Sequence, residues 1–497
     1  MSTSPSGQPA PSSAASSLPV TALEEEVHEL KRSLGLTEAT MIGVGAMIGA
    51  GIFGLTGIAA GKAGPVGLLI AFLLNGIVTS LTGLTYAELG AAMPEAGGGY
   101  LWVREGLSRF WGFFSGWISW FSHSVACSLY AVLFATFFVE LMEIAGISID
   151  WTPGWLGLAP GEWLIKGLVV LVVAIFAFIN FKGASETGLV GNIVTITKVA
   201  ILLTIVGFGI KAMMEAPTAA LVWENFRPAL PNGWAGVFAA MGLTFVAFEG
   251  YEIIAQTGEE LHHPERNLPR AIFLSIAIVV AIYLLVAFVA VGVPVQQTLG
   301  MEPWKYLAQF GERGMVRIAE FIMPYGRVLM LVGGLASTTS ALNATVYSSS
   351  RVSFAMGRGR DLPRFFGRVH PKTRTPHWAI LMSALLIAFM GVALPVEDVG
   401  SGASLTFLML FLLTNITLIR MRKTHPDLPR PFRVPLVPYL PIAAVLIQGF
   451  LAGHLFEVSP LAWYATLLWI VAGVGLYYGY LVRMRNGGNS PSSPSID

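Results

Sequence analysis

Three ionisable side chains lie inside long apolar stretches of this sequence, where an unpaired charge is costly. Lys198 lies in NIVTITKVAILLTIV, and Glu249 and Glu252 lie in GLTFVAFEGYEIIAQTGEE. An ionised group in the middle of a bilayer costs several kcal/mol unless it is paired or faces water. Burial of a lysine also favours its neutral form, so that such a group can exchange a proton. These residues therefore point to proton exchange, and to the binding of charged groups in a cavity that water reaches.

The low fraction of charged residues and the high fraction of hydrophobic residues indicate that most of the chain is not exposed to water. A soluble domain carries about 25% charged residues, whereas 12% of these 497 residues are charged and 54% are hydrophobic. The apolar content excludes a disordered chain, and a net charge of +1 offers no basic field for nucleic acid. The single cysteine, Cys127, can form no intrachain disulfide, and the sequence contains no CxxC motif or other metal-binding cluster. We therefore expect a membrane protein without a metal or cofactor.

Long apolar segments recur along the chain, and each is long enough to cross a bilayer as a helix. We expect twelve spans, at 37–60, 65–91, 107–144, 162–180, 185–213, 234–257, 268–292, 325–350, 377–395, 401–420, 437–456 and 461–482. They would form an all-α bundle over residues 35–485. We expect a cytoplasmic, partly disordered N-terminal tail at 1–34 and a disordered C-terminal tail at 486–497.

The charged residues are sorted between the two sides of this topology. With the N-terminus in the cytoplasm, 21 Lys and Arg residues fall on the cytoplasmic side, 8 fall outside, and Lys198 lies within a span. The cytoplasmic loops of membrane proteins carry the excess of Lys and Arg. An even number of spans places both termini on one side. We therefore expect a multi-pass protein of the cell membrane with both termini in the cytoplasm.

The first span, GVGAMIGAGIFGLTG, is too rich in glycine to favour a continuous helix. We predict that the helix unwinds around Ile48–Gly51. The freed N–H groups and the dipole of the second half-helix could then hold a carboxylate. The alternative is close helix packing through the GxxxG pair of Gly45 and Gly49. The GxGxxG pattern that begins at Gly49 is no dinucleotide site, because that motif needs a preceding strand.

The sixth span is also interrupted, at Gly250, with two acidic residues well inside it. Carbonyls freed near Phe245–Phe248 could accept hydrogen bonds from an ammonium group. The two breaks lie five spans apart, and paired broken helices are typical of secondary transporters built from inverted repeats. Spans 1–5 and 6–10 would be the repeats, at about 37–213 and 234–420, and the helices at 437–482 would lie outside them.

Several stretches of the sequence resemble the amino acid–polyamine–organocation transporters. GVGAMIGAGIF resembles their first helix, and FVAFEGYEIIAQTGEELHHPERNLPRAI resembles their sixth helix and the loop that follows. SSSRVSFAMGRGRDLPRFFGRVHPKTRTP resembles their cytoplasmic loop between the eighth and ninth helices. TGEE followed by Pro264, Arg266 and Pro269 is most similar to the cationic amino acid transporter branch. Bacterial relatives of that branch often have twelve spans, the number expected here.

This resemblance implies a LeuT-type fold and the transport of amino acids. It places the substrate carboxylate on the first break, at Met47, Ile48, Gly49, Ala50 and Gly51. It places the substrate amine near the carbonyls of the sixth span, at Phe245, Val246, Ala247 and Phe248. Phe245 and Phe248 are the candidates for an aromatic gate.

Lys198 matches a fifth-helix lysine of the proton-coupled members of the family. The resemblance therefore implies that protons are the coupling ion and that Lys198 carries the coupling. Its ammonium would occupy the place where sodium-coupled relatives bind a cation. The other interpretation is a lysine that extends to the membrane surface, which a position in the middle of the span disfavours.

Glu249 departs from the family pattern, which usually has an aliphatic residue there and the acid three positions later, at Glu252. Glu249 either faces the cavity, where it would favour a cationic substrate or take part in proton movement, or it pairs with a polar group on another span. Glu252, Ser337 and Ser340 are further candidates to line the site. For the serines the alternative is hydrogen bonding between helices.

These features together predict a proton-coupled secondary transporter of amino acids that works by alternating access. An exchanger of amino acids or polyamines, or a membrane sensor of amino acids, would use the same fold. An enzyme is disfavoured because no nucleophile–base pair or metal set is present, and ATP-driven pumping because there is no Walker A motif. The expected partners are a small molecule that is an amino acid, protons and the lipid bilayer.

Overall fold

The computed structural model describes residues 34–94, 98–147, 161–183, 188–295 and 300–481 of the chain. The two expected tails lie outside these ranges, apart from Leu34. Within them the regular elements are helices, and an isolated backbone bridge joins Leu34 to Leu261. The chain is therefore all-helical where it is described, as the sequence predicts.

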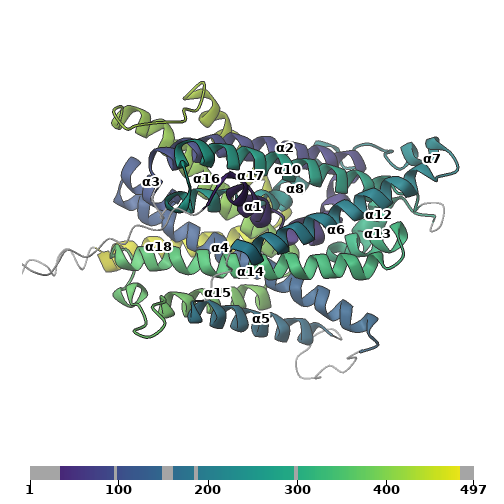
Figure 1. The fold of residues 1–497 in the computed structure, drawn as a ribbon, viewed down its shortest axis with the longest axis horizontal. Coiled ribbons are helices and arrows are strands. Elements are labelled where there is room, and N and C mark those ends of the chain that lie inside the picture. The colour runs from purple at the N-terminus through teal and green to yellow at the C-terminus, as the bar shows by residue number, and fades with distance from the viewer. Residues whose placement is uncertain (1–33, 95–97, 148–160, 184–187, 296–299, 482–497) are drawn as a thin grey trace, which may run out of the picture.

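Long helices account for most of the described residues. They are α1 (Leu36–Met47), α2 (Thr56–Ala92), α4 (Arg109–Ile144), α5 (Glu162–Lys182), α6 (Gly188–Met214), α8 (Gly233–Thr244), α10 (Pro264–Gly292), α14 (Gly326–Arg358), α15 (His377–Ala393), α16 (Val396–Thr424), α17 (Tyr439–Val458) and α18 (Pro460–Leu476). Shorter helices include α3 (Gly98–Gly106), α7 (Ala219–Glu224), α9 (Tyr251–Gln256), α12 (Pro303–Gln309) and α13 (Gly314–Ile322). Most of the long helices run along the longest axis of the molecule (Figure 1).

Among the described residues, ten helical runs are long and apolar enough to cross a membrane. The difference from the twelve expected spans arises at two places. The run Leu36–Ala92, of 57 residues, contains the first two expected spans, which a kink at Gly64 (φ 74°) separates. Helix α15 has only 17 residues. At a rise of 1.5 Å per residue it measures about 26 Å, against about 30 Å for a hydrocarbon core.

The helices differ in how far the rest of the protein covers them. The most apolar windows of Arg109–Ile144 and Val396–Thr424 are each 78% buried, and that of Gly233–Gln256 is 83% buried. The corresponding windows of Glu162–Lys182 and Pro460–Gly479 are only 28% and 17% buried. Helices α4, α8, α9 and α16 therefore form the interior, whereas α5 and α18 present apolar side chains outward, as lipid-facing helices do.

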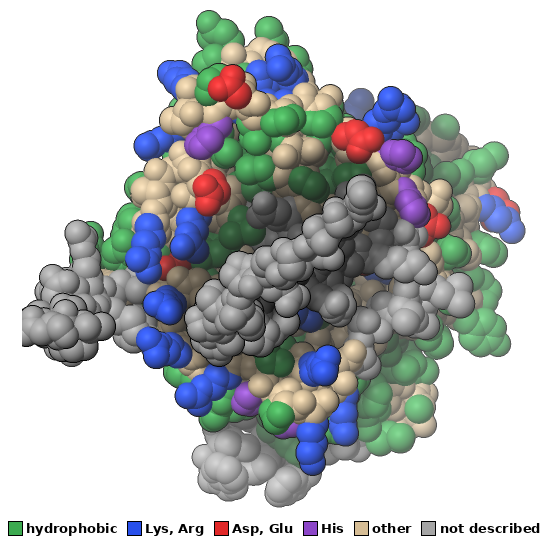
Figure 2. All heavy atoms as spheres, turned by 60° about the vertical axis from the view of Figure 1, so that its left-hand side comes forward, with side chains coloured by type: hydrophobic (Ala, Val, Ile, Leu, Met, Phe, Trp, Pro, Cys, Tyr) green, Lys and Arg blue, Asp and Glu red, His purple; other side chains and the backbone are tan. Residues whose placement is uncertain are grey.

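Ion pairs show the relative direction of α4 and α14, two long helices that pack along each other. Arg109, at the start of α4, pairs with Asp361, just after α14, whereas Glu140, near the end of α4, pairs with Arg327, at the start of α14. The helices are therefore antiparallel. We name the two ends of the bundle the Asp361 end and the Glu140 end. Lys and Arg side chains gather around the Asp361 end, where α3 also lies (Figures 1 and 2).

Candidate functional site

The first span is interrupted where the sequence predicts. Helix α1 ends at Met47, and Ile48 has non-helical angles (φ −74°, ψ 68°) before the chain coils again from Gly51 to Leu55. The Ser337 hydroxyl of α14 donates a hydrogen bond of 2.7 Å to the carbonyl of Ile48. Its position against the freed carbonyl makes Ser337 part of the break. Ser340, the other serine expected there, is half-buried and makes no side-chain hydrogen bond with the described residues.

The sixth span is interrupted over Phe245–Gly250. Helix α8 gives way to a 3₁₀ turn at Phe245–Phe248, Glu249 is extended, and α9 begins after Gly250. Gly250 has φ 118°, a conformation that side chains rarely adopt. A Cβ on Gly250 would also lie 2.7 Å from the Cβ of Ala46 on α1. Glycine is thus required both by the backbone turn and by the close approach of α1.

The two breaks touch one another. A Cβ added to Gly51 in the first break would overlap the side chain of Ala247 in the second. The hydroxyl of Tyr283 on α10 lies 2.7 Å from the Met47 carbonyl and 3.0 Å from the Ala247 carbonyl. Its one proton is therefore shared between two main-chain oxygens at the interruptions of the helices, of which the Met47 carbonyl also accepts a hydrogen bond of 2.7 Å from the N–H of Gly49. Tyr283 ties the two interrupted segments together from a third helix.

The two glutamates of the sixth span have different surroundings. Glu252 accepts a hydrogen bond of 2.6 Å from the backbone N–H of Gly250, two residues earlier, so it caps the start of its own helix. Glu249 accepts a hydrogen bond of 3.1 Å from the Tyr130 hydroxyl on α4. The second oxygen of Glu249 has no hydrogen-bond partner among the described residues, although the side chain is only 4% exposed. Glu249 therefore has one carboxylate oxygen that could still accept a hydrogen bond.

Lys198 is fully buried in α6, and its ammonium donates a hydrogen bond to the carbonyl of Gly45 on α1. That carbonyl lies three residues before Ile48, where α1 unwinds. The side chain is thus directed at the first span, and it does not extend toward a membrane surface. Thr195, one turn earlier on α6, lies against the bare face of Gly45. Glycine at this position lets the two helices approach closely enough for the lysine to reach α1.

Three hydroxyl groups that hold the breaks in place were not predicted from the sequence. Two of them belong to Tyr283 and Tyr130. The third, Ser404 of α16, accepts a hydrogen bond of 3.0 Å from the N–H of Val246 and donates one of 3.2 Å to the carbonyl of Leu243. The signal in the sequence was weak, because α4 and α16 contain several other polar residues from which Tyr130 and Ser404 do not stand out.

The structure brings the ten residues expected to bind substrate into one place, and all of them are buried. They are Met47, Ile48, Gly49, Ala50, Gly51, Phe245, Val246, Ala247, Phe248 and Glu249. The ring of Tyr130 closes over Gly49, where an added Cβ would lie 3.3 Å from it. A small molecule could reach the breaks only if the surrounding helices moved apart.

Comparison with known proteins identifies the family. The model of a family described as amino acid permease matches residues 34–474, which include both breaks and Lys198. The chain belongs to the amino acid permease family. This permease is therefore a multi-pass membrane protein of a family that transports amino acids.

Three relatives illustrate the range of the family. The branched-chain amino acid permease BcaP of Bacillus subtilis (strain 168) is 30% identical over 461 residues, 91% of this chain and 93% of its own length. The serine/threonine exchanger SteT of the same organism is 28% identical over 471 residues, which cover 93% of this chain and 99% of its own. The chloroplastic cationic amino acid transporter 9 of Arabidopsis thaliana is 30% identical over 349 residues, 69% of this chain and 58% of its own. Their names cover three different classes of amino acid.

Proposed function

We propose that this permease is a secondary active transporter that moves amino acids across the cell membrane by alternating access and is driven by protons. The observation that carries the proposal is the contact between the two helix breaks, which Tyr283 bridges through the carbonyls of Met47 and Ala247. Broken helices that meet inside a bundle are a recurrent substrate site of secondary transporters. The complete burial of this site supports a mechanism in which helices separate to admit the substrate.

The proposed topology has twelve crossings in two inverted repeats. Helices α1, α2, α4, α5 and α6 would form the first repeat and α8 with α9, α10, α14, α15 and α16 the second, with α17 and α18 outside them. The two breaks then fall on the first helix of each repeat. The Asp361 end would face the cytoplasm together with both termini, because the excess of Lys and Arg belongs to the loops at that end.

The two breaks offer complementary groups to an amino acid. The substrate carboxylate would bind the N–H groups of the first break, and the substrate amine would bind carbonyls of Phe245–Phe248. Glu249 has an unpartnered oxygen at the end of this segment and would accept the cationic group of a lysine or arginine substrate. Hydrogen bonds to charged groups contribute about 1.5–3 kcal/mol each. A preference for cationic over apolar amino acids follows.

Proton coupling is tested with Lys198→Ala in liposomes that contain purified protein and carry a pH gradient. We expect uphill accumulation of the substrate to be lost, because the group that would exchange protons beside α1 is gone. Downhill exchange of labelled for unlabelled substrate should persist. Lys211→Ala is the matched control, since Lys211 is on the same helix but is exposed and pairs only with Glu215 among the described residues. Accumulation by Lys198→Ala would refute proton coupling through this residue.

The role of Glu249 is tested by binding of lysine, arginine and leucine to Glu249→Gln, which keeps the shape of the side chain. We expect the affinity for lysine and arginine to fall about tenfold or more, the equivalent of about 1.4 kcal/mol, and the affinity for leucine to stay unchanged. An equal affinity for all three ligands before and after the substitution would instead support a purely structural pairing with Tyr130. Saturable binding without any flux in the wild-type protein would identify a sensor.

A further inference from the structure

A groove lies beside the first turns of α10, at the Asp361 end and away from the helix breaks. Its volume is about 750 Å³, and α10 forms one side of it while the loop between α16 and α17 forms the other. Its lining includes Arg266, Arg270, Phe273, Leu274 and Ala277 from α10 and Phe432 from the loop. We call this feature the α10 groove.

Charge and apolar surface are separated along the α10 groove. Arg266 and Arg270 are one helical turn apart, and Phe273 and Ala277 continue the same face toward the middle of the bundle. From Arg266 to Ala277 this face extends about 16 Å at 1.5 Å per residue. Both arginines are exposed, and neither makes a side-chain hydrogen bond or ion pair with the described residues. The groove thus has a cationic mouth and an apolar floor.

A neighbouring acid does not neutralise this mouth. Glu265 also lines the groove, but its carboxylate lies 3.4 Å from Nδ1 of His263 and is turned to that side chain. With two arginines against one glutamate, the mouth keeps an excess of positive charge. An anionic group is therefore the complementary ligand at this position.

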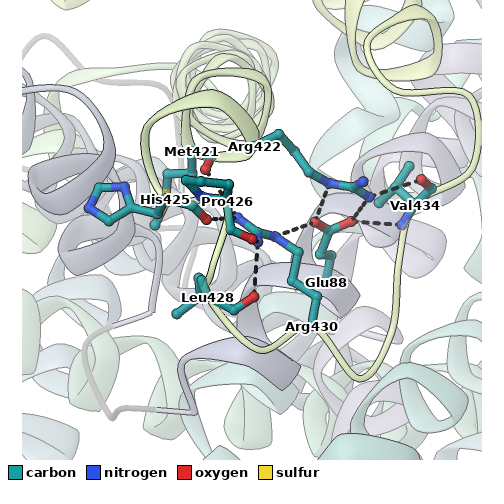
Figure 3. Close-up of polar contacts among 8 residues, drawn as sticks. All are labelled: Glu88, Met421, Arg422, His425, Pro426, Leu428, Arg430 and Val434. Atoms are coloured by element: carbon teal, nitrogen blue, oxygen red, sulfur yellow. Dashed lines mark hydrogen bonds and ion pairs between the residues drawn. The ribbon is translucent and has the colours of Figure 1, made fainter.

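The opposite wall is held by a cluster of charged groups around the fully buried Glu88, which Figure 3 shows. Arg422 binds both oxygens of Glu88 at 2.6 Å, and the backbone N–H of Val434 donates to one of them at 2.7 Å. Arg430 lies 3.1 Å from Glu88 and donates to main-chain carbonyls of its own loop and of the last turn of α16. We call these four residues the Glu88 cluster. It anchors the chain on both sides of Phe432, so the wall is a built part of the fold.

The floor of the groove continues onto a lipid-facing surface. The ring of Phe432 packs on that of Phe273, with centroids 6.0 Å apart. Farther along α10, Leu274, Ile278 and Leu285 are 45%, 40% and 41% exposed. In a membrane protein such exposed apolar side chains contact acyl chains. The groove therefore leads from a charged surface at one end of the bundle directly into the hydrocarbon region.

We propose that the α10 groove binds one anionic phospholipid from the leaflet at the Asp361 end. Its phosphate lies between Arg266 and Arg270, and one acyl chain lies along Phe273, Leu274 and Ala277. Basic pockets beside transmembrane helices are suited to anionic headgroups. A free phosphate would leave the apolar floor uncovered, and a zwitterionic lipid would bring a second cation to a mouth that already has an excess of positive charge. The proposal depends on the protein lying in a membrane and not on its substrate or coupling ion.

The test measures lipid binding to the purified full-length protein in neutral detergent, by native mass spectrometry and by the shift of the melting temperature. Phosphatidylglycerol, phosphatidylcholine and glycerol phosphate are the three probes. We expect one phosphatidylglycerol molecule to bind per protein molecule. It should raise the melting temperature more than phosphatidylcholine or glycerol phosphate does. Arg266→Gln with Arg270→Gln should weaken its binding about thirtyfold, since each basic residue near an anionic headgroup is worth a factor of about five.

Two further variants make the result decisive. Arg364→Gln with Arg368→Gln removes two exposed arginines from the same end but outside the groove, and should leave the binding of phosphatidylglycerol unchanged. Ala277→Trp fills the floor without any change in charge, and should weaken phosphatidylglycerol binding even if the arginine variant does not fold. Equal binding of both phospholipids would overturn the proposal. So would equally tight binding of glycerol phosphate, or an equal loss in the control variant.

Discussion

Two buried glutamates close opposite ends of this permease, and they do so with different geometry. Glu88, near the end of α2, and Glu140, near the end of α4, are both fully buried, and both face arginines. The Glu88 cluster lies at the Asp361 end, where α3 contacts both α4 and α16. Each cluster joins segments that are distant in the sequence. What distinguishes them is how completely each carboxylate is satisfied.

At Glu88, both carboxylate oxygens are filled by short bonds. The forked contact of Arg422, at 2.6 Å to each oxygen, is the strongest form of an arginine–carboxylate pair. Arg430 is only 3% exposed. Burial lowers the pKa of its guanidinium, and the charge of Glu88 acts against that shift. Glu88 thus compensates a cation that water does not reach.

At Glu140, three arginines surround one carboxylate, and the contacts are looser. Arg327 donates a hydrogen bond of 3.0 Å from Nε to one oxygen, and its Nη2 lies 3.0 Å from the same oxygen. Arg317 lies 3.4 Å from that oxygen. The other oxygen has no hydrogen bond among the described residues, since Arg313 lies 3.8 Å away. These arginines are 22–29% exposed, so water already solvates them in part. Arg422 of the Glu88 cluster is also 25% exposed, so the contrast in hydration lies in Arg430, which is 3% exposed.

The difference indicates which end can separate at the lower cost. Opening the Glu140 end exposes partly hydrated arginines to more water. Opening the Glu88 cluster would break a forked pair and strip a buried cation of its counter-charge, which is far more costly. If transport proceeds by alternating access, we expect the contacts around Glu140 to break and reform in the cycle. The Glu88 cluster should stay intact as part of the wall of the α10 groove.

The largest predicted effect is on stability at Glu88. Removing one partner of a buried ion pair costs about 3–5 kcal/mol, so Glu88→Gln should lower the free energy of unfolding by roughly that amount. Glu140→Gln should cost about 1–2 kcal/mol, because each of its three arginines keeps partial access to water, whereas Arg430 beside Glu88 does not. Equilibrium unfolding in mixed micelles measures both. Glutamine keeps the shape of the side chain, so neither variant creates a cavity. Equal losses would show that the geometry of the two clusters does not matter.

A second prediction concerns the shape of the arginine contacts. Lysine supplies one point charge and cannot fork across two oxygens. Arg422→Lys should therefore lower the free energy of unfolding by about 1–2 kcal/mol. Arg327→Lys should lower it by about half as much, because two nitrogens of Arg327 contact a single oxygen of Glu140. The same unfolding experiment compares the two variants. A larger loss for Arg327→Lys would reverse the assignment of the stronger pair.

Sequence reasoning located the helix breaks because they depend on local signals. Repeated glycines around Ile48 destabilise a continuous helix, and acidic residues beside Gly250 are costly inside a bilayer. Such residues in a span therefore indicate that the span has a function besides crossing the membrane. Lys and Arg gather at the Asp361 end, in agreement with the sorting of cations along the sequence, and the side of the membrane that this end faces stays a prediction. The kink at Gly64 and the shortness of α15 were less accessible, because apolar composition alone does not show where one helix ends.

The partners of the buried polar groups could not be predicted from the sequence. Tyr130 lies 119 residues from Glu249, and Tyr283 lies 236 residues from Met47, so no periodic pattern relates them. For Glu249 both interpretations find a counterpart in the structure, since one oxygen pairs with another helix and the other has no partner among the described residues. Packing of distant helices, which sequence periodicity does not encode, decides these contacts.

The smallest predicted effect is at Arg313, which makes the longest of the contacts with Glu140. Its Nε lies 3.8 Å from the carboxylate, and the side chain is 29% exposed. Exposed ion pairs contribute about 0–1 kcal/mol, so Arg313→Gln should lower the free energy of unfolding by about 0.5 kcal/mol or less. Removing one of three like charges also relieves repulsion between the arginines, which offsets part of that loss. A loss as large as that of Arg327→Gln would mean that Arg313 is a full member of the cluster and that the Glu140 end is held as firmly as the other.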